Sequence, residues 1–182
     1  LRSSIEGSDR TVNRFEVFPS VHLGYTLPHE QKLTFAYSYR TNRPELFFME
    51  PYITYRDYYT AEIGNPDIRP EYIHSFELNY KKTMGEHTLQ SSLFYRKRKD
   101  KIERLRVPYE AGVTLDSMAN VGNDYSLGVE LSTQLKVTKW WNLDVNGNIY
   151  YYKVMNNINS GGKKETSTNY DFTVNNLFRV HK

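Results

Sequence analysis

Side chains able to hold a ligand are concentrated between residues 47 and 59 of this chain. Large amphipathic rings in a loop can stack on a sugar or anchor a peptide at low entropic cost. The residues predicted to contact a ligand are Phe47, Phe48, Tyr52, Tyr55, Arg56, Asp57, Tyr58 and Tyr59. The sequence equally allows a second role, in which the rings pack this loop against its neighbours.

A run of basic residues occupies positions 96–101. Basic clusters can bind nucleic acid, but a formal net charge of +3 over 182 residues is too small to favour that partner. Lys97 and Lys99 share a strand face with Tyr95, and we therefore predict that these two lysines contact lipid phosphates. The alternative is that they form the solvated base of a loop.

Residues of enzymatic or metal chemistry form no recognised arrangement. The sequence contains no nucleophile elbow, phosphate-binding loop or dinucleotide fingerprint. The histidines lack the spacing of metal ligands; they are His22, His29, His74, His87 and His181. The sequence therefore predicts no enzymatic activity, no metal site and no cofactor.

The elements that carry these residues are recognised by strict alternation of apolar and polar side chains. Leu33, Phe35 and Tyr37 fall on one side of a strand, with Thr34 and Ala36 on the other, because strand side chains alternate between faces. Most such strands approach or exceed the roughly 9–11 residues that cross a bilayer. Seven are predicted, at residues 13–25, 32–41, 72–82, 87–98, 124–136, 141–154 and 169–182.

The connections between these strands are alternately short and long. The short ones are 27–31, 83–86 and 137–140, and the long ones are 42–71, 100–123 and 155–168. Tight turns at one end and long loops at the other are typical of a transmembrane β-barrel. The predicted fold class is therefore all-β, an antiparallel transmembrane β-barrel.

Aromatic residues on the apolar face favour this barrel over a soluble β-sandwich that binds glycans through its tyrosines. Barrels place aromatic side chains at both membrane interfaces, with an aliphatic band between them. The expected rows are Tyr25, Tyr80 and Trp141 beside the short turns, and Tyr39, Tyr95, Tyr125, Tyr151 and Tyr170 beside the long loops. The polar row should face the lumen; it includes Glu77, Asn79, Gln90, Glu130, Gln134, Asn142, Asp144, Asn146 and Asn148. Pro19, inside the first strand, predicts a bulge there.

Composition agrees with a barrel that is larger than this chain. Hydrophobic residues are 38% of the sequence, as expected when only alternate strand residues face lipid, and no apolar run reaches the roughly 18 residues of a spanning helix. The chain begins at Leu1 without a signal peptide. We expect residues 1–182 to be part of one barrel domain within a longer polypeptide, with the signal peptide absent from the chain.

Several stretches together resemble the barrel of TonB-dependent outer-membrane receptors, in the branch carrying the outer membrane protein beta-barrel domain. The segment Gly64-Asn65-Pro66 is the clearest of them, and we expect Gly64 to take a positive φ while Pro66 keeps Asn65 out of the α region. The other stretches are Phe18–Tyr25, Tyr37–Pro44, Pro51–Tyr59, Phe76–Tyr80 and Gly128–Leu143.

This resemblance implies a barrel of about 22 strands in the cell outer membrane, of which the chain supplies about a third. It further implies a plug domain that is absent from this chain, a TonB-type periplasmic protein that acts on the plug, and active uptake of a siderophore, glycan or peptide. Outer-membrane lipid and a surface lipoprotein are the other partners expected. The alternative function is a barrel without transport activity, such as an adhesin.

Overall fold

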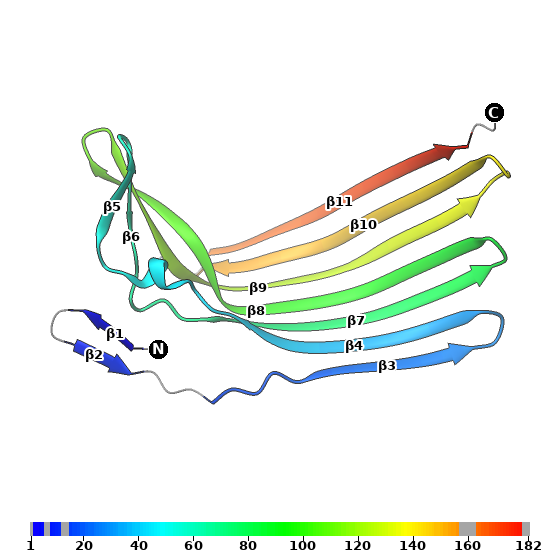
Figure 1. Cartoon of the computed structure of the whole chain (residues 1–182), viewed down its shortest axis with the longest axis horizontal. Coiled ribbons are helices and arrows are strands. Elements are labelled where there is room, and N and C mark those ends of the chain that lie inside the picture. The colour runs from blue at the N-terminus through cyan, green and yellow to red at the C-terminus, as the bar shows by residue number, and fades with distance from the viewer. Residues whose placement is uncertain (1, 6–7, 12–14, 157–162, 180–182) are drawn as a thin grey trace.

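The strands expected from the alternation form one antiparallel sheet (Figure 1). The computed structural model describes residues 2–5, 8–11, 15–156 and 163–179. The strands that span the sheet are β3 (Ser20–Leu27), β4 (Gln31–Asn42), β7 (Glu71–Met84), β8 (His87–Glu110), β9 (Val113–Lys136), β10 (Trp141–Asn156) and β11 (Lys163–Phe178). Within these ranges, no helix is long and apolar enough to cross a membrane.

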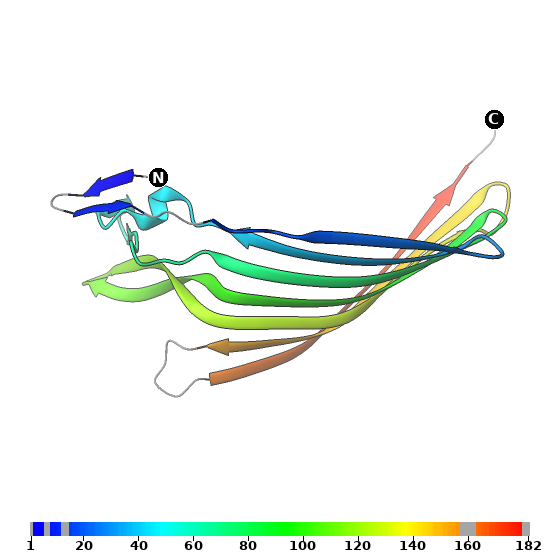
Figure 2. The same cartoon turned by 90° about the horizontal axis from the view of Figure 1, so that it is seen from below.

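Neighbouring strands of the sheet are joined in sequence order, as β11-β10-β9-β8-β7-β4-β3. The sheet is open, with β3 at one edge and β11 at the other, and it curves along its length (Figure 2). The short turns lie together at one end of the sheet, and the long connections lie at the other (Figure 1). This arrangement confirms the all-β antiparallel fold class.

Cross-strand register keeps the apolar side chains on a single face. Phe35 pairs with Leu23 and Leu78, and Leu78 pairs in turn with Leu93. Continuing across the sheet, Val129 pairs with Leu93. The expected aromatic rows also fall on this face, and the expected polar row falls on the other, by the same register.

The apolar face is exposed. Large apolar side chains along it, among them Leu23 at 62% and Phe172 at 70% exposure, have no protein cover. Buried hydrophobic residues among those described are Ala61, Ile68, Phe94 and Val121. A sheet with so small a core and so large an apolar surface has the pattern of a wall that faces lipid.

The first strand begins later than the sequence predicts. Residues 15–19 are not in a strand and β3 starts at Ser20, so the predicted bulge at Pro19 is wrong. Pro19 lies just before the strand, where its carbonyl accepts a bond from the amide of Tyr39 (3.0 Å) but its ring nitrogen has no hydrogen to donate. Residues 13–14 of the predicted first strand and 180–182 of the last lie outside the described residues. The alternation also missed a hairpin, β1 (Arg2–Ile5) with β2 (Ser8–Thr11).

The predicted long loop at 100–123 is wrong. Strands β8 and β9 continue through it as a paired hairpin, as far as the pair Glu110 and Val113. An irregularity between residues 98 and 102 marks the point where they pass beyond the rest of the sheet, and Asp100 adopts a φ of 55° there. The sequence concealed this because the extension has no lipid-facing side and its polar composition resembles a loop.

The connection 42–71 is long, as predicted, but it is folded. It contains a 3-10 helix, η1 (Leu46–Met49), and a hairpin of β5 (Ile53–Asp57) and β6 (Thr60–Ile63). Strand β6 pairs in parallel with β9 at residues 114–117, so the connection is fixed to the β8–β9 extension. The predicted loop at 155–168 is shorter than expected, since β10 ends at Asn156 and β11 begins at Lys163.

Candidate ligand-binding site

The predicted ligand-contact segment lies at the long-connection end of the sheet, where backbone bonds hold it to β9 (Figure 1). The amide of Thr114 donates to the carbonyl of Tyr59 (2.8 Å), and four residue pairs join β6 to β9. Ala61, at the centre of β6, is fully buried. The segment is therefore a docked platform, defined here as η1, β5, β6 and residues 64–70.

Gly64 is required by a close approach of two backbone segments. A Cβ at Gly64 would lie 2.6 Å from the amide nitrogen of Glu50, well inside van der Waals contact. The amide of Gly64 donates to the carbonyl of Glu50 (3.0 Å), and that of Asn65 donates to Phe48 (2.7 Å). Gly64 does not have the positive φ expected from the sequence; the motif needs glycine for its lack of a side chain.

Asn65 and Asn120 join the end of the platform to the β8–β9 extension. The Asn65 side chain accepts a bond from the amide of Asp67 (3.0 Å) and donates to the carbonyl of Met118 (3.1 Å). The Asn120 side chain accepts from the amide of Arg69 (2.8 Å) and donates to its carbonyl (2.9 Å). These bonds satisfy the turn backbone and fix where the chain re-enters the wall.

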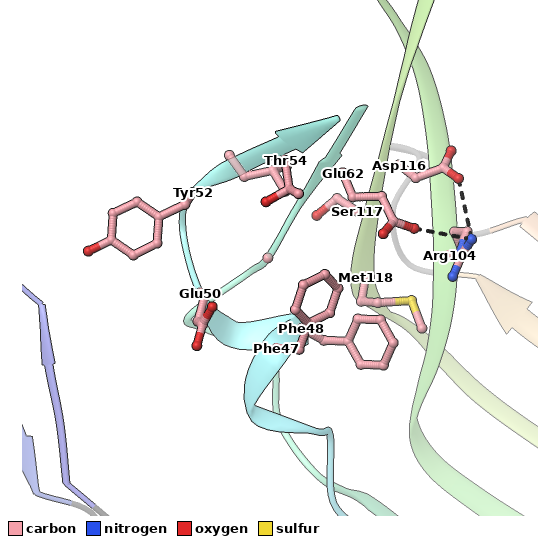
Figure 3. Close-up of a pocket in the computed structure, with 12 residues that line it drawn as sticks. Phe47, Phe48, Glu50, Tyr52, Thr54, Glu62, Arg104, Asp116, Ser117 and Met118 are labelled. Carbon is pink, nitrogen blue, oxygen red and sulfur yellow. Dashed lines mark hydrogen bonds and ion pairs between the residues drawn. The ribbon is translucent and has the colours of Figure 1, made fainter. Parts of the chain in front are cut away.

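A narrow pocket of about 20 Å³ lies between the platform and the extension. In Figure 3 the rings of Phe47 and Phe48 lie beside Met118, and Arg104 reaches toward both Glu62 and Asp116. The complete lining is Phe47, Phe48, Glu50, Tyr52, Thr54, Glu62, Ile63, Gly64, Arg104, Asp116, Ser117 and Met118. The pocket therefore has an apolar floor and a charged rim, and its volume is that of about one water molecule.

Ion pairs link the strands around this pocket. Glu62 pairs with Arg56 (2.7 Å) and Arg104 (3.4 Å). The buried carboxylate of Asp116 accepts two bonds from the Arg106 guanidinium, at 2.6 and 2.8 Å. Those bonds lower the pKa of Asp116 below its ordinary value, with smaller contributions from the charges of Arg104 and Arg56. The platform and the extension are thus joined by charge as well as by backbone bonds.

The structure divides the predicted ligand-contact residues into two groups. Phe47, Phe48 and Tyr52 line the pocket, and the Phe47 and Phe48 rings meet edge to face at 5.7 Å. Tyr55, Tyr58 and Tyr59 lie on the β5–β6 hairpin with exposures of 55%, 86% and 66%. Arg56 is ion-paired, and Asp57 accepts a bond from the amide of Tyr59 (2.8 Å) that closes the turn.

A polar network at the wall end of the extension was missed by the sequence reasoning. Arg98 lies 3.5 Å from each of two buried carboxylates, Glu71 and Asp124. Glu71 also accepts a bond from the amide of Ile102 (2.7 Å), and Asp124 accepts one from the Tyr152 hydroxyl (2.7 Å). The sequence did carry a signal for this network. Glu71 and Asp124 stand at the starts of two predicted strands, on the same face as Arg98.

Lys97 and Lys99 lie on the apolar face, as their alternation with Arg96 and Arg98 predicted. Both are exposed, and with Tyr39, Tyr72, His74, Glu16 and Val17 they line a hollow on that face. Across the described part of the chain, no group of three or more acidic or histidine side chains could hold a metal ion.

Comparison with known proteins gives a consistent result. The sequence profile of the outer membrane protein beta-barrel family matches residues 2–182. No curated protein matches the chain. The siderophore receptor PirA from Pseudomonas aeruginosa superposes with a TM-score of 0.61 at 15% identity, over 86% of this chain and 34% of that one.

Two further solved structures share the fold. The ferric enterobactin receptor PfeA from Pseudomonas aeruginosa, as a mutant with enterobactin bound, gives a TM-score of 0.56 at 14% identity, covering 91% of this chain and 33% of that one. The copper transporter OprC gives 0.55 at 14% identity, covering 90% and 31%. The chain spans about a third of each of these three structures, which are receptors and a transporter rather than enzymes by name. With the family profile matching nearly its whole length, the chain belongs to the outer membrane protein beta-barrel family, whose members reside in the cell outer membrane.

Proposed function

We propose that the chain supplies wall strands and the extracellular platform of a TonB-dependent receptor that takes up a ligand across the outer membrane. In this proposal the complete barrel has about 22 strands. A plug domain fills it and contacts the polar face, where Glu77, Glu130 and Asn146 offer hydrogen-bonding groups. A TonB-type periplasmic protein acts on that plug, and a surface lipoprotein delivers ligand from outside.

The observation that carries this proposal is the way the platform presents its rings. The backbone of residues 59–65 is bound to β9 and to η1, and the ion pair of Glu62 with Arg104 joins the same region to β8. Yet the rings of Tyr55, Tyr58 and Tyr59 remain exposed. Exposed rings on a fixed support suit recognition, because little conformational entropy is lost when a ligand stacks on them.

The chemistry of the platform defines the class of ligand. A ligand that fits would offer a flat or apolar surface to the tyrosines and polar groups to the pocket rim at Glu62 and Arg104. Siderophores, glycans and peptides meet this description. The named functions of PirA, PfeA and OprC concern siderophores and copper, so ferric siderophores are the first ligands to test.

The proposal is tested by growth of the source organism in defined media, each with a single iron source, glycan or peptide. Strains lacking this gene and strains lacking the TonB-type protein should share a defect on at least one nutrient. Replacing Tyr52, Tyr55, Tyr58 and Tyr59 together by Ala should reproduce the defect of the gene deletion. The matched set of four Tyr→Phe substitutions keeps the rings and should restore most of the growth, since stacking needs the ring and not the hydroxyl.

An adhesin or a structural barrel would give a different result. The deletion strain would then lose attachment or envelope integrity, with no nutrient defect in common with the strain lacking the TonB-type protein. That result, with the variant barrels present in the membrane at normal levels, would refute the receptor proposal.

A further inference from the structure

Charge is distributed unequally between the two faces of the wall. By cross-strand register, every acidic residue of the wall strands below the β8 irregularity lies on the polar face. These residues are Glu71, Glu77, Asp124, Glu130, Asp144, Glu165 and Asp171. The apolar face carries none of them, so a lysine on that face has no acidic neighbour from these strand segments on its own side of the sheet.

Lysines on the apolar face gather at the end that carries the long connections. Lys97 of β8 pairs with His74 of β7 and with Tyr125 of β9, and Tyr125 pairs with Lys153 of β10. Lys99 lies on the same face, two residues further along β8. Neighbouring strands are about 4.8 Å apart, so Lys97 and Lys153 lie about 10 Å apart at the backbone, within reach of one anionic headgroup.

These lysines are not neutralised by the protein. Among the described residues, no carboxylate lies within ion-pair distance of Lys97, Lys99 or Lys153; the Lys153 ammonium lies 5.4 Å above the ring of Tyr125. The one carboxylate in the hollow beside Lys97 and Lys99 belongs to Glu16. That carboxylate accepts bonds from the Tyr72 hydroxyl and, at 3.4 Å, from an Arg43 guanidinium nitrogen.

The depth of these lysines in the membrane follows from the aromatic row. Tyr95 and Tyr151 lie on the same strands, two residues closer to the aliphatic band than Lys97 and Lys153. Aromatic rows of barrels sit at headgroup level, so the ammonium groups lie where lipid phosphates are found. We propose that Lys97, Lys99 and Lys153 form a binding surface for phosphate groups of outer-leaflet lipid, with the aromatic hollow of Tyr39, Tyr72 and His74 beside it.

The test uses the complete protein in detergent and lipid A as the probe. Lipid A with its phosphates and the same lipid after enzymatic dephosphorylation are titrated separately, with binding followed by native mass spectrometry. We expect the wild-type protein to prefer the phosphorylated lipid, and the variant Lys97→Gln/Lys99→Gln/Lys153→Gln to bind it about tenfold or more weakly, since each lysine near an anionic surface contributes measurably. The matched control, Lys32→Gln/Lys81→Gln/Lys82→Gln, removes the same charge at the short-turn end and should bind as wild type.

Three results would overturn the proposal. These are equal binding by the lysine variant and wild type, equal binding of the two lipids by wild type, and displacement of lipid A by inorganic phosphate at the same concentration. The last result would identify a general anion site and not a lipid surface. Since the readout is lipid binding and not nutrient uptake, its outcome is independent of the receptor proposal.

Discussion

Substitution of Gly64 by Ala tests whether the platform is held by close backbone contact. The new Cβ would lie 2.6 Å from the amide nitrogen of Glu50, whereas non-bonded heavy atoms prefer about 3.5–4.0 Å. The contact is made to backbone and not to a flexible side chain, so the platform must move by about 1 Å or hold the strain.

Movement and retained strain cost a similar free energy. Movement weakens the bonds from the amides of Gly64 and Asn65 to Glu50 and Phe48, at 3.0 and 2.7 Å, which together contribute about 2 kcal/mol. Retained strain costs about 1–3 kcal/mol, the usual range for overpacking. A loss of about 2 kcal/mol raises the population of the open platform about 30-fold.

Hydrogen exchange measured by mass spectrometry on the complete protein in detergent reports this local opening. Peptides covering β6 and residues 64–70 should exchange about 30-fold faster in Gly64→Ala, while peptides from β7, β10 and β11 should be unchanged. Gly147→Ala is the matched control. A Cβ at Gly147 would meet its nearest atom, in the Phe172 ring, at an ordinary 3.6 Å.

If the platform of Gly64→Ala exchanged hydrogen at the wild-type rate, this reasoning would be refuted, because the added Cβ would then cost no free energy. Equal acceleration in Gly147→Ala would refute it too, since any added methyl group would then have the same effect.

Three further predictions concern the ion pairs and the wall. Arg106→Gln removes both guanidinium bonds to Asp116, so limited proteolysis should cut the β8–β9 hairpin extension faster and leave the wall intact. Because those bonds lower the pKa of Asp116, their stabilisation is complete above the ordinary aspartate pKa and is lost as the pH falls through the lowered one. Hydrogen exchange of the wild-type β8–β9 extension should therefore accelerate only in strongly acidic solution. Gly128→Ala would bring a Cβ within 2.7 Å of the buried Phe94 ring and against Tyr150, and thermal unfolding followed by circular dichroism should show a loss of about 1–3 kcal/mol.

Each of these has a result that would contradict it. Unchanged proteolysis of Arg106→Gln would mean that the backbone pairing alone holds the hairpin. Acceleration of exchange already near neutral pH would place the titrating group elsewhere. A melting temperature of Gly128→Ala equal to that of wild type would mean that the Phe94 ring has room to move aside.

The wall strands were predictable because lipid on one side and polar groups on the other impose the same period along the whole strand. Leu33, Phe35 and Tyr37 obey that period without exception, and the β4 boundaries differ from the predicted ones by one residue at each end. Lys97 and Lys99 were placed on the apolar face for the same reason. Alternation reports the environment of a strand, and a uniform environment is easily read.

Beyond the membrane that constraint ends, and so did the accuracy of the prediction. The extension of β8 and β9 has no lipid on either side, although Leu105, Val107 and Tyr109 do alternate with Arg104 and Arg106. The ion pair of Arg106 with Asp116 joins residues brought together by the hairpin register, which depends on the irregularity at Asp100. The role of Gly64 depended on the position of Glu50, and turn propensities do not contain that information.

The β8–β9 extension has a consequence for what the cell surface presents. From residue 101 to residue 110, a strand at about 3.3 Å per residue carries the hairpin tip about 30 Å along the strand beyond the wall irregularity. In the receptor proposed above, a folded projection of this length stands at the extracellular end, where it meets an arriving ligand, antibody or phage fibre. Because the extension is a paired hairpin that the platform contacts, and not a free loop, every arriving molecule meets nearly the same shape. A constant shape favours binding of a ligand, and it equally favours binding of an antibody or a phage fibre.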